Sequence, residues 1–469
     1  MTSSYPLMAS VSGIRGIFGK SFIPEVIEKY VASFINVQKE TIKKENISII
    51  LGRDSRVSGS CVNNIVIGIL LATGCDIIDI GIVPTPTVQV IVQQRKADGG
   101  IVITSSHNDV MWNGLKFIDN DGLFISPEKC KTLFKMVDEK KYSYNEYNKL
   151  GKYEEKPEEY KKHIEKILEL EYIKPEEIKM KNLRICIDTI NGAGGRILKE
   201  LLEKLGCKEI IGINIEETGI FAHKPEPIPE HLNQLCEAVQ NNKADLGIAV
   251  DPDADRCVLI DEKGQPLGEE YTLGFAVEFY LGKLGKKGNV CKNLSSSRVV
   301  DDIAAKYGSK VFNSAVGEIN VAQEMIRTNS IIGGEGNGGV MLPDVHIGRD
   351  SLVSVALVLQ LLSSFNGTIS QLKNSLPQYQ IAKLRIDLSP DLDPDLIIQQ
   401  YVNRFSNTNG FVLNSLDGLR IDSKDWWVHL RKSNTEPIIR IIGESSDPNV
   451  SSFQLCQRFV DEIQDKDKK

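Results

Sequence analysis

The sequence has no excess of positive charge, and this lack bears first on its partners. Its 56 lysine and arginine residues are outnumbered by 63 aspartate and glutamate residues, which gives a formal net charge of −7. Nucleic-acid-binding domains usually present a basic surface to the phosphate backbone. We therefore expect no nucleic-acid partner.

The sequence also lacks a hydrophobic run long enough to cross a membrane. The uncharged stretch 351–372 has an apolar centre of only about ten residues, whereas a spanning helix needs about 20. We expect a buried helix there and no membrane partner. The first residues contain no basic stretch followed by an apolar one, so we expect no signal peptide.

The nine cysteines form no CxxC pair, and their number is odd. Disulfide frameworks and cysteine zinc sites both need cysteines at set spacings. Scattered cysteines are typical of reduced core residues, so we expect neither kind of site. The same pattern indicates a cytoplasmic protein.

What the sequence does contain is a globular composition and a repeated strand–helix pattern. Hydrophobic residues make up 41% and charged residues 25% of 469 positions, a length that predicts about three domains. Short apolar segments that end in polar residues alternate with amphipathic helical stretches. They are residues 47–56, 100–109, 183–195 and 246–256. This pattern predicts βα units with mixed or parallel sheets, in which functional side chains gather where strands end.

Three breaks divide the chain. The charged stretch 140–181 is typical of a linker and an exposed helix, a second break follows Arg256, and a third lies near 374–380. The last segment mixes strand and helix patterns and predicts a small α+β domain. The predicted domains are α/β at 1–150, 151–256 and 257–373, and α+β at 374–469.

Three aspartates alternate directly after an apolar segment, at Asp251, Asp253 and Asp255. Clustered carboxylates repel one another, so the pattern predicts a hard cation with oxygen ligands, with a solvated polar turn as the alternative. An EF-hand is excluded because Arg256 stands where that loop requires glycine. A guanidinium beside three carboxylates also suits a site that handles phosphate.

A second polar strand end, residues 104–109, has the sequence TSSHND. Ser106 and His107 are adjacent and would point to opposite sides of an extended chain, so they do not form a self-contained nucleophile–base pair. A serine in such a turn is by itself more often a structural cap. Lys116 is able to move protons if a dry or cationic site lowers its pKa, although alone it is more often a surface lysine.

Two further loops carry side chains suited to a polar ligand. Residues 333–339 hold five glycines around Glu335 and Asn337, which lets the backbone approach a ligand while these two side chains bind sugar hydroxyls. Residues 431–440 concentrate arginine, hydroxyl and amide donors suited to a phosphate dianion. A flexible turn and a surface loop are the respective alternatives.

These four motifs, in this order and together with SGIRGIFG and GRDSR near the N-terminus, resemble the α-D-phosphohexomutase superfamily over nearly the whole chain. The resemblance implies three related mixed-sheet α/β domains and a smaller C-terminal α+β domain around a central cleft. It implies reversible interconversion of hexose 6-phosphate and hexose 1-phosphate. The implied route passes through a phosphoserine and a hexose 1,6-bisphosphate, which also acts as activator.

The resemblance also implies roles for single residues. Ser106 would carry the phosphoryl group and, with Asp251, Asp253 and Asp255, would bind Mg²⁺. The candidate catalytic residues are Ser106, His107, Lys116, Arg15 and Arg256. The candidate substrate-binding residues are Glu318, Glu335, Asn337, Arg431, Ser433, Asn434, Thr435 and Arg440.

Three positions depart from the pattern of many family members. Asp109 stands where proline is frequent, and Asn337 and Gly339 stand where serine and histidine are frequent. The missing histidine leaves the second acid/base role without an obvious holder. Glu318 stands where phosphoglucosamine-specific members often carry a carboxylate, which can pair with a substrate ammonium.

We therefore expect a cytoplasmic phosphohexomutase, monomeric or homodimeric, that acts on glucosamine phosphate and resembles archaeal-type phosphoglucosamine mutases. The closest alternative is a phosphomannomutase/phosphoglucomutase. A haloacid-dehalogenase-type phosphatase is suggested by the start of the aspartate motif, but Asp255 replaces the threonine or valine of that motif. A sugar-phosphate sensor without turnover is the last alternative.

Overall fold

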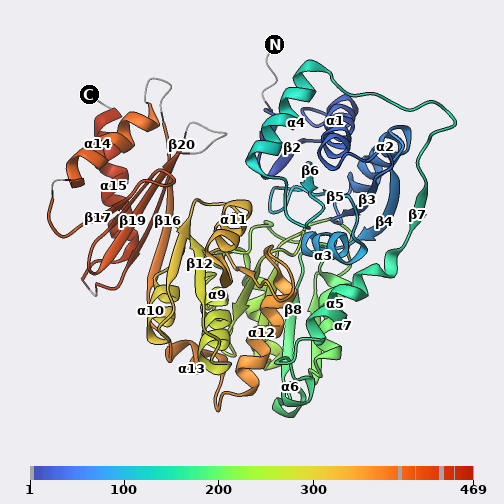
Figure 1. Ribbon diagram of the computed structural model, residues 1–469. Coiled ribbons are helices and arrows are strands. Elements are labelled where there is room, and N and C mark those ends of the chain that lie inside the picture. Colours follow the sequence, from blue (N-terminus) through green and yellow to red (C-terminus); the bar gives the residue numbers. More distant parts are fainter. Residues whose placement is uncertain (1–4, 389–392, 407, 433–437, 448, 468–469) are drawn as a thin grey trace.

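The computed structural model of the protein describes residues 5–388, 393–406, 408–432, 438–447 and 449–467. Within these residues the strands form four sheets, one in each of four units that follow one another along the chain (Figure 1). The first unit lies apart from the fourth, and the second and third lie between them (Figure 1).

The first sheet has seven strands in the order β1-β2-β6-β5-β3-β4-β7. They are β1 (Met8–Ser10), β2 (Gly13–Ile17), β3 (Ser48–Arg53), β4 (Asp76–Ile82), β5 (Gly99–Ile103), β6 (Trp112–Ile118) and β7 (Tyr153–Glu155). Side chains alternate between the faces, so Ile49 joins one core and Ile50 the other. One face packs against α1 (Pro24–Ile42), α2 (Gly59–Ala72) and α4 (Pro127–Glu139), and the other against α3 (Thr85–Arg95).

The second and third sheets have four strands each, in the orders β11-β10-β8-β9 and β15-β14-β12-β13. The strands are β8 (Arg184–Asp188), β9 (Glu209–Ile213), β10 (Leu246–Val250), β11 (Cys257–Ile260), β12 (Asn289–Asn293), β13 (Val311–Ser314), β14 (Ser330–Glu335) and β15 (Gly339–Met341). Each sheet has three parallel strands and one antiparallel edge strand. The same pattern recurs in the first sheet as β6-β5-β3-β4, which confirms the prediction of three related units.

Helices cover these two sheets. Those of the second unit are α5 (Lys161–Leu168), α6 (Pro175–Lys181), α7 (Gly195–Lys204) and α8 (Asn233–Asn242). Those of the third unit are α9 (Glu270–Val277), continued by a π-helical turn at Glu278–Lys283, and α10 (Val299–Lys306), α11 (Glu318–Thr328), α12 (Ser351–Ser363) and α13 (Ile369–Asn374).

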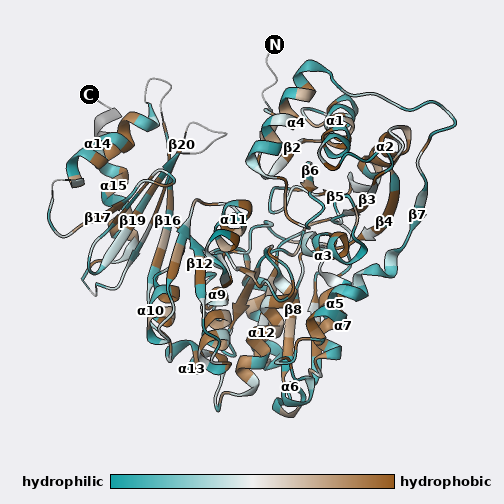
Figure 2. Cartoon of the chain, in the orientation of Figure 1, coloured by the Kyte–Doolittle hydropathy of each residue, from teal (hydrophilic) through white to brown (hydrophobic). Residues whose placement is uncertain are grey.

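The uncharged stretch 351–372 contains the buried helix that was predicted. The side chain of Asp350 caps α12 by accepting hydrogen bonds from the backbone N–H groups of Leu352 and Val353. Every residue of α12 before Ser363 is buried, and Figure 2 shows hydrophobic residues along this helix. Among the residues that the structure describes, no helix is both long and apolar enough to cross a membrane.

The fourth unit is a five-stranded antiparallel sheet in the order β16-β20-β19-β18-β17, with two helices. Its elements are β16 (Gln380–Asp387), α14 (Pro394–Ser406), β17 (Val412–Asn414), β18 (Leu419–Asp422), β19 (Trp426–Lys432), β20 (Ile438–Ser445) and α15 (Ser452–Asp467). This unit confirms the predicted small α+β domain. The domain boundaries stay a prediction, although β11 pairs with β10 and so carries the second sheet past residue 256.

Candidate active site

The three α/β units each contribute an equivalent loop to one region. The serine loop (residues 104–111) joins β5 to β6, the aspartate loop (251–256) joins β10 to β11, and the glycine loop (335–339) lies between β14 and β15. In each unit this connection leads from a parallel strand to its antiparallel neighbour. The shared topology therefore presents the three loops at the carboxyl ends of corresponding strands, where α/β proteins bind ligands.

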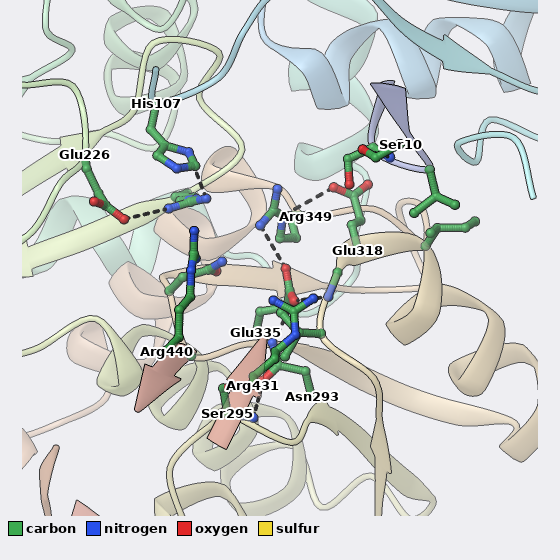
Figure 3. Close-up of a pocket in the computed structure, with 18 of the residues that line it drawn as sticks. Ser10, His107, Glu226, Asn293, Ser295, Glu318, Glu335, Arg349, Arg431 and Arg440 are labelled. Atoms are coloured by element: carbon green, nitrogen blue, oxygen red, sulfur yellow. Dashed lines mark hydrogen bonds and ion pairs between the residues drawn. The ribbon is translucent and has the colours of Figure 1, made fainter. Parts of the chain in front are cut away.

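A cleft of about 350 Å³ lies where these loops meet, and residues of all four units line it (Figure 3). The predicted site residues that line it are Arg15, His107, Lys116, Arg256, Glu318, Glu335, Asn337, Arg431 and Arg440. Ser106 and the three aspartates contact this lining through His107, Lys116 and Arg256. Ser433, Asn434 and Thr435 lie outside the described residues.

The Ser106 hydroxyl points toward the aspartate loop. The residue has a φ of +48°, a left-handed conformation that is unusual for serine, and its backbone N–H donates to Thr104 Oγ1 at 2.9 Å. Its Oγ donates to Asp251 Oδ2 at 3.2 Å, and the side chain is buried. The turn therefore aims the hydroxyl at the carboxylates of another unit, a contact between residues 145 positions apart.

Arg56 holds the serine loop in place, a role that the sequence did not reveal although the GRDSR motif contains the residue. Its guanidinium is fully buried and donates to the carbonyl oxygens of Ser106 and Asn108 at 2.6 and 2.7 Å, and to two further carbonyls of the loop and β6. Asp54 pairs with Arg56 at 2.9 Å and accepts a hydrogen bond from Thr104. Arg56 thus satisfies backbone acceptors that the tight turn leaves without partners.

His107 is not a well-placed base for Ser106. Burial and the nearby guanidinium groups of Arg256 and Arg15 lower the pKa of His107 well below its ordinary value. Its Nδ1 lies 3.0 Å from Nη2 of Arg256 and 3.4 Å from Ser106 Oγ. Because a guanidinium only donates, Nδ1 is the acceptor and the imidazole is neutral. The two side chains do not point to opposite sides as predicted for an extended chain, because the left-handed turn at Ser106 brings His107 Nδ1 to its hydroxyl.

The three aspartates form a compact cluster of carboxylates. Their side chains are fully buried, and a ligand oxygen from each lies within 4.8 Å of the others. Oδ1 of Asp253 and Oδ1 of Asp255 accept no hydrogen bond. Burial and the neighbouring carboxylates raise the pKa of Asp251 well above its ordinary value. Buried oxygens without partners and mutual repulsion fit a hard divalent cation with oxygen ligands.

Lys116 comes from β6 and reaches the same aspartates. Its Nζ lies 2.6 Å from Asp253 Oδ2 and 3.4 Å from Asp255 Oδ2. Burial lowers the pKa of Lys116, but Asp253 and Asp255 outweigh burial, so its pKa is raised. The sequence analysis required a lowered pKa for Lys116 to move protons, and the structure does not meet this requirement. The protonated ammonium is instead suited to donate a proton or to bind a phosphate oxygen.

Arg349 links the aspartate loop to the glycine loop and was not among the predicted site residues. Its Nη2 donates to Asp255 Oδ2 at 2.6 Å, and its Nη1 donates to Glu335 Oε2 at 2.8 Å. Its Nε donates to Glu318 Oε2 at 3.2 Å. In the sequence Arg349 stands in a short loop before α12, and nothing in that pattern marked it.

Glu318 and Glu335 are held by further hydrogen bonds. Gln89 from α3 donates to Glu318 Oε1 at 3.1 Å, while Asn293 and the backbone N–H of Gly317 donate to Glu335 Oε1 at 2.6 and 2.8 Å. Burial raises the pKa of Glu318 to about 7, although Arg349 opposes this rise. Both carboxylates therefore have fixed positions on the cleft wall (Figure 3).

The fourth unit contributes cations to the cleft. Arg431 and Arg440 both line it, from neighbouring positions on β19 and β20 (Figure 3). The Nε of Arg431 donates to Asp417 Oδ2 at 2.7 Å, and the same oxygen accepts from the backbone N–H of Val316 in the third unit at 2.9 Å. Asp417 therefore ties Arg431 to the segment that precedes Glu318.

A second group of side chains in the described residues also has the geometry of a metal site, away from these loops. The Nε2 atoms of His163 and His346 lie 2.8 and 2.9 Å from Asp350 Oδ2, and all three residues are buried. Thr87 contacts Nδ1 of His163 at 3.0 Å. The other oxygen of Asp350 caps α12. Both carboxylate oxygens thus have hydrogen-bond partners.

Comparison with known protein families gives matches in the order of the three α/β units. The models for phosphoglucomutase/phosphomannomutase α/β/α domains I, II and III match residues 8–143, 158–264 and 269–379. A phosphoglucomutase/phosphomannomutase of Thermococcus kodakarensis is 35% identical over 434 residues, which cover 92% of this chain and 93% of the relative. A phosphoglucosamine/phosphogalactosamine mutase of Sulfurisphaera tokodaii is 34% identical over 445 residues, covering 94% and 95%.

Solved structures show the same fold. A phosphoglucomutase/phosphomannomutase family protein from Burkholderia thailandensis superimposes with a TM-score of 0.82 at 24% identity, over 97% of both chains. Because these alignments cover more than nine-tenths of the chain, the similarity includes the fourth unit as well as the three α/β units.

Proposed function

The chain belongs to the phosphoglucomutase/phosphomannomutase family and is therefore a phosphohexomutase, and from this premise we propose that it interconverts glucosamine 6-phosphate and glucosamine 1-phosphate. The observation that carries the choice of sugar is Glu318, a carboxylate on the cleft wall beside Glu335. A carboxylate favours a substrate ammonium over a hydroxyl, because only the ammonium carries a compensating charge. The family assignment removes the phosphatase alternative.

The role proposed for Ser106 follows from its surroundings. A phosphoryl group on its Oγ would lie beside the three aspartates, with Lys116, Arg15 and Arg256 as the surrounding cations. Phosphoryl transfer depends mainly on positioning and on neutralising charge. Asp251, Asp253 and Asp255 would hold Mg²⁺ together with Ser106, and the ion supplies positive charge that stabilises the transferring group.

The reaction conserves the phosphoryl group over two steps. In the first, a sugar hydroxyl forms the new bond to phosphorus and the bond between phosphorus and Ser106 Oγ breaks, while the hydroxyl proton passes, in net terms, to Oγ and regenerates the serine hydroxyl. The product is the hexose 1,6-bisphosphate, which turns end for end and returns its other phosphoryl group to Ser106. The phosphate that is not being transferred would be held by Arg431, Ser433, Asn434, Thr435 and Arg440.

A comparison of sugars tests the substrate. Purified protein, Mg²⁺ and a trace of glucose 1,6-bisphosphate are assayed with glucosamine, glucose and mannose phosphates. We expect the highest kcat/KM for glucosamine phosphate. Glu318→Gln keeps the shape of the side chain but removes its charge, so it should lower kcat/KM for glucosamine phosphate about tenfold or more and spare glucose phosphate.

A wild-type preference for glucose or mannose phosphate would overturn the glucosamine proposal and favour the alternative that the name of the Thermococcus relative suggests. An equal loss of kcat/KM for all three sugar phosphates in Glu318→Gln would also count against the glucosamine proposal. The carboxylate would then support the site in general and would not select the ammonium. Binding of sugar phosphates without any turnover would support the sensor alternative.

The phosphoserine is tested by intact-protein mass spectrometry. We expect part of the purified protein to carry one extra phosphate that maps to Ser106, and its share to rise after incubation with glucose 1,6-bisphosphate. Ser106→Ala should carry none. Phosphate mapped to another residue would contradict the proposed carrier. We expect the protein to be a monomer or a homodimer, and light scattering on the same sample distinguishes these two states.

A further inference from the structure

The side chain of Arg349 contacts both the aspartate loop and the glycine loop. Its three guanidinium nitrogens each donate to a different carboxylate, on Asp255, Glu335 and Glu318. These carboxylates belong to the aspartate loop, the end of β14 and the start of α11. A planar guanidinium fixes the directions of its donors, so it sets the separation of the groups that it binds more strictly than a lysine would.

The side chain of Arg349 lies in space that Gly339 leaves open. A Cβ atom at position 339 would lie 2.4 Å from Arg349 Cδ and 2.8 Å from its Cγ, which is well inside van der Waals contact. Gly339 does not have a positive φ angle. The glycine is therefore required here for space and not for its backbone conformation. Glycine at position 339, where many family members have histidine, therefore leaves room for the aliphatic part of the Arg349 side chain.

The backbone from which Arg349 extends is itself fixed. The next residue, Asp350, caps α12 and accepts hydrogen bonds from His163 and His346. The base of the arginine thus cannot move without breaking a buried network. Arg349 as a whole is only 9% exposed and lines the cleft (Figure 3).

We propose that Arg349 is a positioning residue of this mutase, which holds Asp255 of the cation site and Glu335 of the glycine loop in register, and that residue 339 must be glycine to admit it. This inference rests on the proposed function. Arg349 acts through Asp255, the carboxylate that its Nη2 contacts, and through Glu335. In-line phosphoryl transfer tolerates little displacement, so loss of this bridge should act mainly on kcat.

A double-mutant cycle tests the link between the arginine and the glycine. We expect Arg349→Ala to lower kcat about 100-fold, and Gly339→Ala to do nearly the same by displacing the arginine stem. In the double variant the second change should add little, because there is no stem left to displace. Arg349→Lys should restore part of kcat, since it returns the charge but not the three-way fork.

Controls separate this positioning role from a general loss of structure. Arg327→Ala removes an exposed arginine of α11 that pairs only locally with Glu324, and it should leave kcat unchanged. KM should change less than kcat in the Arg349 variants. Additive losses in the cycle, or a Gly339→Ala variant with wild-type kcat, would overturn the proposal.

Binding of Mn²⁺, measured by calorimetry without substrate, gives a second reading that does not depend on turnover. Loss of the contact that holds Asp255 in place should weaken Mn²⁺ binding about tenfold, because one of the oxygen ligands is then no longer positioned. The two single variants and the double variant should change affinity equally. Unchanged Mn²⁺ affinity in Arg349→Ala would overturn the inference. A wild type that acts on no hexose phosphate would overturn only the proposed function, so the two failures are distinguishable.

Discussion

Two buried clusters among the described residues have the spacing of a metal site, and they differ in how their carboxylate oxygens are satisfied. Asp251, Asp253 and Asp255 form one, and His163, His346 and Asp350 form the other. In the second cluster both imidazoles contact one oxygen of Asp350 and the cap of α12 uses the other, so the carboxylate has full partners. In the first cluster two carboxylate oxygens accept no hydrogen bond.

The difference shows that distance between ligand atoms does not by itself make a cation site. A carboxylate that is buried and fully hydrogen-bonded gains little from a metal, because coordination would first break its existing contacts. Asp253 and Asp255 each keep one buried oxygen that accepts no hydrogen bond, so a cation could bind these oxygens without breaking such a contact. The aspartate cluster also touches the cleft through Lys116 and Arg256, whereas the histidine cluster joins α5 to the start of α12.

The largest effect should come from the serine that contacts the aspartate cluster. Ser106→Ala removes the hydroxyl that is to carry the phosphoryl group, so we expect kcat to fall at least about 1,000-fold without loss of stability. Initial rates with bisphosphate present, together with thermal melting, measure this. Ser105→Ala is the matched control and should keep activity within about tenfold. Substantial turnover by Ser106→Ala would mean that another group carries the phosphate.

The clusters are compared directly by one substitution in each. Asp253→Asn should abolish Mg²⁺ binding and lower kcat more than about 100-fold, because it removes the negative charge of one of the three carboxylate ligands. Asp350→Asn should leave metal stoichiometry unchanged but lower the melting temperature, because buried donors lose a charged acceptor at a cost of about 1–3 kcal/mol. Calorimetric titration with Mg²⁺ distinguishes them. Loss of one metal equivalent in Asp350→Asn would reverse our assignment of the two clusters.

A smaller effect is expected for Arg431 of the fourth unit, which we propose to bind a substrate phosphate and not the metal. Arg431→Ala removes a charge-assisted phosphate contact of about 2–3 kcal/mol, so KM should rise about 30- to 150-fold, with metal affinity unchanged. Asp417 would also lose its partner Arg431, but it keeps the contact with Val316. Steady-state kinetics measure the change. An unaltered KM would argue against the phosphate role of this arginine.

The smallest effect concerns a buried carboxyl with neither a cation site nor a complete set of partners. Burial raises the pKa of Glu270 to about 8, its Oε1 has no hydrogen-bond partner, and its other oxygen lies where a Cβ at Gly336 would be. A raised folded-state pKa gives stability that is present below about pH 4.5 and is lost as pH rises through 8.

Glu270→Gln removes this titration, so the comparison of the two proteins isolates it. Between pH 6 and pH 9 the wild type should lose about 2–3 kcal/mol relative to the variant, since the carboxyl ionises only in the upper part of that range when folded. Melting temperatures at both pH values measure the difference. Parallel pH profiles of the two proteins would show that Glu270 is already ionised at pH 6.

The fold class was predictable because strand and helix periods are local properties of the sequence. The repeated βα pattern gave the three mixed-sheet units, and the uncharged stretch before Gly367 gave the buried helix α12. The pattern did not show that the strand after Arg256, β11, leaves a tight loop and pairs back onto β10. Pairing partners of edge strands are decided by tertiary contacts and not by local pattern.

By itself the sequence determined which chemical groups this protein has and the order in which strands deliver them: the serine, the aspartates and the glycine-rich loop each follow a strand, and that order places them at one edge. Only the tertiary structure decided how those groups are held. Arg56 and Arg349 contact partners 50 and 94 positions away. Such contacts form only when the fold brings distant buried charges together. The residues next to each arginine in the sequence are not its partners, so no local pattern indicates these contacts.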